Sequence, residues 1–449
     1  MTLDRRQIVT AGIGLGAAVA GPRPAESQAA AAPAHGVPAS EFGVISDSAS
    51  DQASALQLAI EAASRSGTPL LLPGTTLHTG RLNLKAGTYL VGVPGRTVLR
   101  YVGQSGLLAC DGARDVRLQG VTLDGGKRPL GQSDGLLAAR AVQQLLIRDC
   151  RFTASAGSGI AVDGCGGAIS DCEIDDIARA GVFCIDAKGF EIGHNHVHDC
   201  ANNGIQVWRS EKGEDGGLVV NNRIERIKAE AGGSGQNGNG INVFRAGSVL
   251  VTGNRISDCA FTAIRANAAS NCQMIANSCA RLGEVALYAE FGFEGSIIAS
   301  NLVDGAATGI SITNFNEGGR LAVAQGNLIR NLFLRKEGEA RGIGIAAEAD
   351  TLVSGNVIEN APAIGILLGW GKYLRDVVAT GNTVRMAGIG IGVSTTAGAG
   401  YALITNNMIS GSKDGAIRAM NFDKPLGRDL TQASAESYRN IAVYGNVGL

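Results

Sequence analysis

Val251-Thr252-Gly253-Asn254-Arg255-Ile256 is one copy of a short pattern that recurs along most of the chain. Each copy holds an aliphatic run, a small residue or turn, an asparagine, one variable residue and a further aliphatic residue. Successive asparagines lie roughly 22 to 32 residues apart, except for one interval of 47 residues between Asn254 and Asn301, and these spacings lie inside the period of about 20 to 50 residues that is typical of solenoids. The asparagines of the pattern are Asn195, Asn222, Asn254, Asn301, Asn327, Asn356, Asn382 and Asn407.

A second pattern, a glycine followed by an aliphatic residue, recurs between the asparagines. Its copies begin at Gly159, Gly181, Gly204, Gly240, Gly309, Gly342, Gly365 and Gly390. Each repeat therefore holds three short strands separated by turns. Side chains of a strand alternate between its two faces, so Asn195 and Val197 should point inward and His196 and His198 outward. No segment after Ala63 has helical periodicity. The sequence predicts an all-β parallel β-helix of roughly a dozen coils.

The composition fits a narrow core of stacked small side chains. Hydrophobic residues make up 45% of the 449 residues but aromatic residues only 4%, and 65 residues are glycine. Ile, Val, Leu and Ala must therefore fill the core. The formal net charge is -1 and the chain has no Lys/Arg cluster, so no nucleic-acid partner is expected.

The inward asparagines should form a ladder of amide hydrogen bonds that satisfies buried backbone groups. Cys150 and Cys172 occupy the asparagine slot in the two preceding repeats, and Cys200, Cys259 and Cys279 share a slot after the aliphatic residue. We expect buried thiols that act as small hydrophobic side chains. Disulfides between adjacent coils are the alternative.

Residues 1–34 have the pattern of an export signal. Arg5-Arg6 precede an apolar stretch from Ile8 to Ala20, and an Ala-rich segment ends at Ala32-Pro33-Ala34. The paired arginines resemble a twin-arginine signal, although Asp4 departs from its usual pattern, and a general secretory signal is the alternative. Both predict a periplasmic or extracellular protein. The apolar stretch is too short to span a membrane, so no span is expected in the mature protein.

The next segment resembles a known β-helix cap. Its residues are Glu41-Phe42-Gly43-Val44-Ile45, a helix with Asp51 as N-cap and Ala55, Leu56, Ala59 and Ile60 facing the core, and Leu70-Leu71-Leu72-Pro73-Gly74. This is similar to the helical cap of pectate-lyase-like and phage-tailspike-like right-handed parallel β-helices. The predicted organisation is an export signal in 1–34, a cap and first coil in 35–100 and repeats in 101–449. Over its full length the chain resembles the twin-arginine-translocated repeat proteins. That resemblance implies right-handed winding and use of the twin-arginine export machinery, but no reaction.

One outward face carries the residues of a candidate site. Enzymes with this fold cleave or epimerise acidic polysaccharides along such a face, and they need a cation for the uronate, a base and an acid. Arg265, Tyr288 and Glu290 are the predicted catalytic residues. An ordinary solvated face is the alternative. The predicted substrate-binding residues of the same face are Trp208, Asn242, Phe244, Asn267, Asp163 and Gln206.

Two segments have some features of metal sites. His194, His196 and His198 alternate along one strand, but His196 should lie between Glu173 and Arg223, and His198 between Asp175 and Glu225, so ion pairs are expected there instead. The acidic segment 211–217 could hold Ca²⁺, although it lacks the alternating ligands of a defined loop. We therefore expect no cofactor, with Ca²⁺ as the alternative.

These features predict an exported β-helix protein that acts on or binds an acidic, uronate-containing polysaccharide. If the protein is an enzyme, β-elimination by a lyase or C5-epimerase is favoured over hydrolysis, since the segment from Asp124 to Asp134 lacks paired catalytic aspartates. A non-catalytic glycan-binding or envelope-structural protein is the alternative. The sequence leaves open whether turnover occurs.

Overall fold

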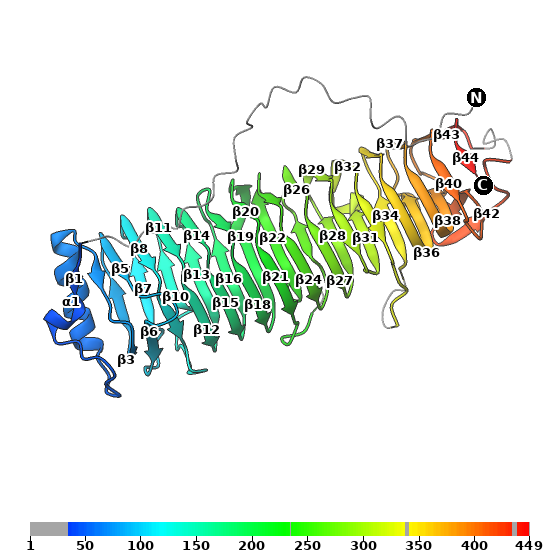
Figure 1. Ribbon diagram of the computed structural model, residues 1–449. Helices are drawn as coiled ribbons and strands as arrows, with labels where there is room; N and C mark the ends of the chain where they lie inside the picture. Colours follow the sequence, from blue (N-terminus) through cyan, green and yellow to red (C-terminus); the bar gives the residue numbers. More distant parts are fainter. Residues whose placement is uncertain (1–34, 234, 337–340, 433–437, 449) are drawn as a thin grey trace, which may run out of the picture. The chain divides into compact units, whose positions relative to one another are not determined.

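Three ladders of parallel strands form the body of the protein. The computed structural model describes residues 35–233, 235–336, 341–432 and 438–448. Within the unit Gly36–Leu449 the chain winds through about 14 turns, with 54% strand and 5% helix (Figure 1). The predicted parallel β-helix is confirmed, with somewhat more coils than expected. The predicted export signal lies outside the described residues.

Each coil contributes one strand to each ladder, in chain order. The first ladder contains β1 (Val37–Pro38), β2 (Leu70–Leu71), β5 (Thr88–Val91), β8 (Asp115–Gln119), β11 (Gln144–Arg148), β14 (Gly167–Ser170), β17 (Glu191–Gly193), β20 (Leu218–Val220), β23 (Leu250–Thr252), β26 (Cys272–Ile275), β29 (Glu294–Ala299), β32 (Arg320–Gln325), β35 (Thr351–Ser354), β37 (Val377–Thr380), β39 (Ala402–Thr405) and β43 (Ile441–Tyr444).

The second ladder follows after a short turn. It contains β3 (Thr76–Thr79), β6 (Val98–Tyr101), β9 (Thr122–Asp124), β12 (Arg151–Ser155), β15 (Glu173–Ile177), β18 (His196–Cys200), β21 (Arg223–Ile227), β24 (Arg255–Cys259), β27 (Ser278–Leu282), β30 (Leu302–Asp304), β33 (Leu328–Arg330), β36 (Val357–Leu368), β38 (Thr383–Ser394), β40 (Met408–Ser410) and β44 (Val447–Gly448).

The third ladder completes each coil, and the long strands β36 and β38 run through both the second and the third ladder. The remaining strands of the third ladder are β4 (Leu82–Leu84), β7 (Leu108–Asp111), β10 (Gly135–Arg140), β13 (Ser158–Asp163), β16 (Ala180–Ile185), β19 (Asn203–Glu214), β22 (Asn239–Gly247), β25 (Ile264–Asn267), β28 (Val285–Glu290), β31 (Thr308–Ile312), β34 (Ile343–Ala347), β41 (Ile417–Asn421) and β42 (Lys424–Leu426). The β41/β42 pair is antiparallel.

A short helical cap covers the first coils. It consists of the 3-10 helix η2 (Ala39–Phe42) and α1 (Ala53–Ser66), which buries Leu56, Ala59 and Ile60. Ala55 is only partly buried against the core. The expected N-cap at Asp51 is wrong by one residue, because the N-cap position is Gln52. Asp51 Oδ1 still accepts the Ala53 N–H at 2.8 Å, together with the Gly80 N–H at 2.9 Å. The carboxylate therefore ties the helix to the first coil. None of the described helices is long and apolar enough to cross a membrane.

The asparagine ladder forms as predicted, at the turn between the first and second ladders. Asn195 Oδ1 accepts the Cys172 N–H at 3.0 Å, and Asn195 Nδ2 donates to the Ile169 carbonyl at 3.0 Å. Asn195 itself donates its N–H and its Nδ2–H to Asn222 Oδ1, each at 3.0 Å. The same contacts repeat through Asn277 and Asn446, which the sequence pattern missed. Each buried amide thus links its own coil to both neighbours.

Glycines at the start of the third-ladder strands allow the coils to approach closely. A Cβ on Gly159 would lie 2.7 Å from the Gly181 carbonyl oxygen, and a Cβ on Gly181 would lie 2.8 Å from that of Gly204. These distances exclude a side chain. The prediction that Gly342 belongs to this set of glycines is wrong. Thr308 pairs with Ile343, so Gly344 and not Gly342 lies beside Gly309.

All nine cysteines are free and buried, as predicted for thiols that fill the core. Cys172 is in the asparagine slot, since its N–H bonds Asn195. The predicted slot of Cys279 was wrong. Cys279 pairs with Ile256, in the aliphatic slot, and Leu282 is the residue that pairs with Cys259. Cys279 therefore replaces a core isoleucine rather than the residue after it.

Replacing Asn356 by Leu should lower the free energy of unfolding by about 1–3 kcal/mol, because buried hydrogen-bonding groups lose their partners. Asn356 is 0% exposed, and its Oδ1 accepts the Asn327 N–H at 3.0 Å. Its Nδ2 donates to the Ala324 carbonyl at 3.0 Å. Urea unfolding followed by circular dichroism measures the change. The exposed Asn316 is the matched control, and Asn316→Leu should change stability by less than about 0.5 kcal/mol. Equal effects of the two substitutions would contradict a structural ladder.

Candidate functional site

The third ladder presents two columns of outward side chains. Strand register places Gln206, Asn242, Arg265 and Tyr288 in one column, each beside the next. The second column contains Trp208, Phe244, Asn267 and Glu290 in the same order. Eight of the nine predicted site residues therefore lie on four successive strands, β19, β22, β25 and β28.

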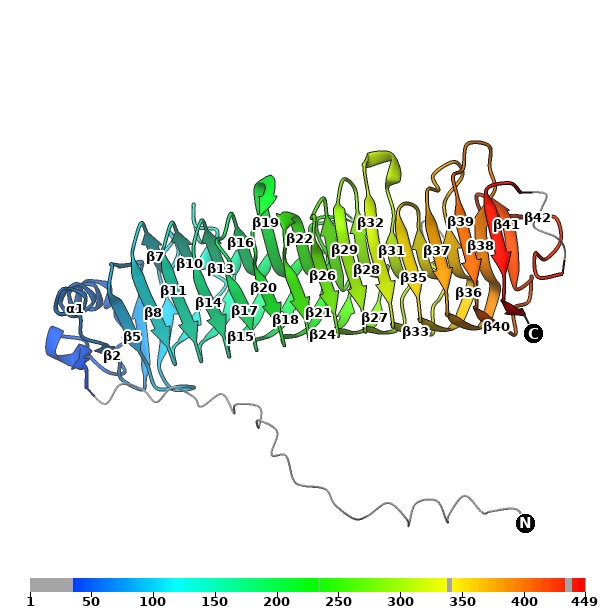
Figure 2. The same ribbon diagram turned by 90° about the horizontal axis from the view of Figure 1, so that it is seen from above.

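Longer chain connections border this face on both edges. On the edge where the chain enters the third ladder, residues 228–238 connect β21 to β22, and a longer segment connects β33 to β34. On the edge where the chain leaves the third ladder, the end of β19, where the register shifts between Trp208 and Gly213, and the β31–β32 connection project to the same side (Figure 2). The β31–β32 connection contains the 3-10 helix η3 (Phe315–Glu317). The described residues of these segments lie along both edges of the third ladder. The turns between the first and second ladders are short by comparison.

The aromatic residues of the face pack against each other. The Trp208 ring meets Phe183 and Phe244 edge-to-face, with ring centroids 5.5 Å apart in both pairs. Trp208 Nε1 donates to Asn242 Oδ1 at 3.2 Å. Trp208 and Phe244 remain partly exposed, while Gln206 and Asn242 beneath them are buried. The rings form a fixed apolar surface, a geometry on which sugar rings can stack.

Arg265 and Glu290 are buried, which corrects the expectation of two exposed groups. Their residues are 7% and 1% exposed. Arg265 binds Glu290 through two parallel contacts, Nε to Oε1 at 2.5 Å and Nη2 to Oε2 at 2.8 Å. Asn267 Nδ2 also donates to Glu290 Oε1 at 2.8 Å. The 228–238 connection covers this pair, since a Cβ on Gly235 would lie 3.6 Å from Arg265 Nη2. The charge of Arg265 is therefore directed to Glu290.

Tyr288 lies at the edge of a cavity of about 310 Å³ on the same face. The Arg265 guanidinium carbon is 5.2 Å from the centre of the Tyr288 ring, so the buried ion pair supports the ring from one side. The cavity brings together residues of β28, β31, β34 and their connections. Its polar lining comes from Glu284, Tyr288, Thr313, Arg335, Arg341 and Glu348.

Burial raises the pKa of two carboxyl groups and of the phenol that line the cavity. Burial raises the pKa of Glu284, against the opposing effect of Arg265 and Arg335. Burial likewise raises the pKa of Glu348, although Glu348 Oε2 accepts the Phe315 N–H at 2.8 Å. Burial and the negative charge of Glu290 raise the pKa of Tyr288. Clustered groups with shifted pKa values beside cations are typical of reactive sites.

Sequence reasoning missed the glutamates and the two arginines of this cavity. Glu348 directly follows the apolar strand β34, and a lone carboxylate at the end of such a run is a usable signal. Arg335 Nη1 contacts Glu284 Oε1 at 3.3 Å, a pairing between segments 51 residues apart. No sequence pattern indicates that pairing. The long β33–β34 connection was the available hint.

Asp163, the ninth predicted site residue, lies on the same face but several coils away from the other eight. It lies four strands along the same column from Asn267, beside Arg140 of the neighbouring coil. It lines a separate open hollow of about 680 Å³. The hollow exists because Ala109, Ala138 and Ala161 present only methyl groups in its floor. The face therefore holds two depressions with the aromatic residues between them.

The acidic segment 211–217 has exposed and buried carboxylates. Glu211 and Glu214 are at least partly exposed, whereas Asp215 is 7% exposed and its Oδ1 accepts the Gly217 N–H at 3.0 Å. Among the described residues, the three groups close enough to share a metal ion are Glu173, His196 and His198, on the second ladder. Calcium binding by 211–217 stays a prediction.

The comparisons with known proteins agree with this architecture. Residues 115–224 match the family described as right-handed β-helix region, which supports right-handed winding. No curated protein matches the sequence. The N-terminal fragment of gene product 12 of bacteriophage Phi29 is similar over 92% of this chain and 70% of that chain, at 16% identity and a TM-score of 0.53.

Two further solved structures are similar at lower TM-scores. The A-module of a mannuronan C-5 epimerase from Azotobacter vinelandii covers 92% of this chain and 99% of its own, at 14% identity and a TM-score of 0.42. A surface adhesin of Streptococcus pneumoniae covers 88% and 95%, at 14% identity and a TM-score of 0.48. At such identities the similarity is one of fold. The chain is a right-handed parallel β-helix protein.

Arg265→Ala should lower the free energy of unfolding by about 3–5 kcal/mol, because it leaves the Glu290 carboxylate buried without its cation. Thermal and urea unfolding measure the effect. Arg281→Ala is the matched control, since Arg281 pairs with Asp258 but its side chain is 66% exposed, and the loss there should stay below about 1 kcal/mol. A similar small loss for Arg265→Ala would contradict a buried pair.

Asp215→Asn should stabilise the protein above pH 6 and have little effect near pH 4. Burial raises the pKa of Asp215 from 3.8 to about 6. The stability contributed by its protonated form is complete below pH 3.8 and is lost as the pH rises through about 6. The neutral amide avoids that loss, a gain of at most about 3 kcal/mol. Melting midpoints of both proteins from pH 4 to pH 8 measure it. A constant difference across this range would contradict the shifted pKa.

Proposed function

We propose that the protein is exported to the periplasm or the extracellular space and acts there on an acidic, uronate-containing polysaccharide along the third ladder. The observation that carries the proposal is the cavity in which Tyr288, Glu284 and Glu348 face Arg335 and Arg341. The aromatic cluster of Trp208 and Phe244 lies on the same face. A glycan running lengthwise over successive coils would contact both, since neighbouring coils are about 4.8 Å apart.

The two arginines of the cavity are the groups that would bind the uronate carboxylate. Arg341 is exposed, and the Arg335 side chain is 24% exposed. Arg265 was the predicted cation for this role, but its guanidinium is engaged by Glu290. In this proposal Arg265 and Glu290 are positioning residues that hold Tyr288 at the cavity edge.

The proposed chemistry is β-elimination. A glutamate of the cavity, Glu284 or Glu348, takes the C5 proton as general base, and its raised pKa brings it closer to neutral pH. The C5–H electrons form the C4–C5 double bond, and the bond from C4 to the glycosidic oxygen breaks. Tyr288, whose raised pKa keeps the phenol protonated, gives its proton to the leaving oxygen. In C5-epimerisation the same proton abstraction would be followed by protonation of C5 from the opposite face.

A non-catalytic glycan-binding protein is the second candidate. The packed aromatic residues and the first hollow, with Asp111, Arg140 and Asp163, offer a binding surface that needs no acid or base. An envelope-structural role would need neither the cavity nor the rings. Both candidate functions include export of the protein by the twin-arginine machinery, directed by a signal in residues 1–34.

Tyr288→Phe should lower turnover of a polyuronate by about 10²- to 10⁴-fold, the usual contribution of a general acid, while binding changes little. Incubation with alginate or pectate, followed by ultraviolet absorbance of unsaturated ends and by NMR of the uronate composition, measures elimination and epimerisation. Trp208→Ala should instead weaken polyuronate binding by about 3- to 10-fold through lost ring stacking.

Melting midpoints of both variants provide the control, since each should remain folded. Polyuronate binding without unsaturated ends or altered uronates would select the binding protein over the enzyme. Unchanged turnover in Tyr288→Phe would contradict the role of the phenol. Absence of polyuronate binding by the wild-type protein would leave only the envelope-structural role.

A further inference from the structure

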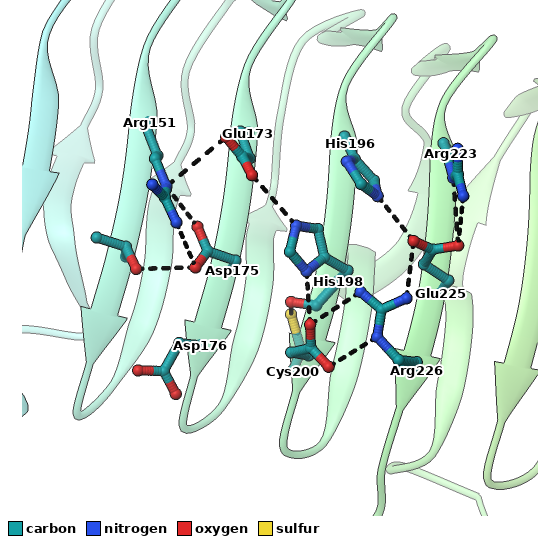
Figure 3. Close-up of polar contacts among 12 residues, drawn as sticks. Arg151, Glu173, Asp175, Asp176, His196, His198, Cys200, Arg223, Glu225 and Arg226 are labelled. Atoms are coloured by element: carbon teal, nitrogen blue, oxygen red, sulfur yellow. Dashed lines mark hydrogen bonds and ion pairs between the residues drawn. The ribbon is translucent and has the colours of Figure 1, made fainter. Parts of the chain in front are cut away.

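A cluster of histidines and carboxylates lies on the second ladder, away from the candidate glycan site. Glu173 of β15 and His196 and His198 of β18 each offer one ligand atom, and these atoms lie within 4.8 Å of one another (Figure 3). The centroids of the two histidine rings are 4.2 Å apart, and the ring planes are inclined by 39°. His194 does not join them, because it occupies the left-handed turn at a φ of 59°.

The contacts of the two histidines differ from those predicted by register alone. His198 was expected to contact Asp175 and Glu225. Asp175 is engaged by the previous coil, where Arg151 Nε lies 2.9 Å from Asp175 Oδ1. Instead, His198 Nδ1 lies 2.6 Å from Asp199 Oδ2, and His196 Nε2 lies 3.0 Å from Glu225 Oε1. Each ring therefore has one nitrogen fixed by a carboxylate.

Arg226 holds both of these carboxylates. Its Nε and Nη2 contact the two oxygens of Asp199 at 2.9 Å each, and its Nη1 contacts Glu225 Oε1 at 2.8 Å. Each carboxylate therefore accepts from Arg226 on one side and faces a histidine nitrogen on the other. We assign the histidine protons to the nitrogens that face these two acceptors.

The other ring nitrogen of His198, Nε2, faces the Glu173 carboxylate. With its proton on Nδ1, a neutral His198 has a lone pair on Nε2, and that atom lies 3.4 Å from Glu173 Oε1. Two lone pairs at this distance repel unless a cation lies between them. Two ligands each about 2.1 Å from a tetrahedral Zn²⁺ are themselves about 3.4 Å apart. Imidazoles oriented by a carboxylate on the far nitrogen are the usual environment of metal-binding histidines.

We propose that Glu173, His196 and His198 bind one divalent transition-metal ion, with Zn²⁺ as the matching metal. Two imidazoles and one carboxylate suit zinc and its neighbours rather than Ca²⁺ or Mg²⁺, which prefer oxygen ligands alone. The Glu173 side chain is 45% exposed and that of His196 37%, so both can adjust to the ion. The ion would link β15 to β18 and thereby two successive coils.

Zinc titration of the full-length, chelator-treated and reduced protein tests the site. Calorimetry should give one Zn²⁺ per chain, and the melting midpoint should rise with Zn²⁺ until the site is saturated, because the ion binds the folded state. Ca²⁺ at the same concentration should leave the midpoint unchanged. If His198 carried a proton on each ring nitrogen, it would have no lone pair for the metal. Absence of a calorimetric signal and of a rise in the melting midpoint would therefore overturn the proposal.

Variants separate this site from the buried thiols and from other histidines. His196→Gln with His198→Gln should abolish the calorimetric signal, and the milder Glu173→Gln, at an exposed position, should weaken binding by about tenfold. Asp199→Asn should weaken it by about 10- to 100-fold through loss of the orienting carboxylate. His194→Asn is the matched control, since asparagine tolerates the left-handed turn and binding should be unchanged. Undiminished Zn²⁺ binding in Glu173→Gln and in the double histidine variant would place the metal elsewhere and overturn the assignment.

Discussion

The fold depends on one interaction that recurs in the successive coils from Asn195 to Asn446, the buried asparagine amide between the first and second ladders. A solenoid turn has a backbone N–H and a carbonyl that no strand partner can satisfy, and burying them unpaired is unfavourable. The asparagine side chain bonds both groups across two coils, as Asn195 does with Cys172 and Ile169. Because the amide reaches a fixed distance, it also fixes the register in which one coil lies on the next.

Fixed register has chemical consequences on the outer surface. Residues at equivalent positions of successive coils become neighbours, although the chain separates them by a full turn. On the third ladder Asn267 lies beside Glu290 in this way, and Arg265, two residues earlier on the same strand, reaches Glu290 diagonally. On the second ladder Glu173 lies beside His196 by the same geometry, and His198 reaches Glu173 diagonally. Polar residues that are about one repeat apart in the sequence therefore form two clusters, one on the second ladder and one on the third.

The connections between strands decide which of these clusters is buried. The second ladder follows short turns and remains partly open, so Glu173 and His196 keep access to solvent. The third ladder lies between longer connections. Residues 228–238 cover Arg265, and the segments near Arg335 and Asn314 close the cavity beside Tyr288. Burial there raises the pKa of Glu284, of Glu348 and of Tyr288, which gives this cavity its distinct chemistry.

The sequence alone determined the parallel coils, the inward asparagines, the buried thiols and the outward columns, because all of these follow from a period of two within strands and a repeat between them. It also placed all nine predicted site residues on one face, eight of them on four successive strands. Only the tertiary structure decided that Arg265 and Glu290 are buried, that Glu284, Glu348, Arg335 and Arg341 complete the cavity, and that His198 contacts Asp199 and Glu173. Those contacts depend on how long connections and side-chain rotamers fill space, and a repeat pattern carries no information about either.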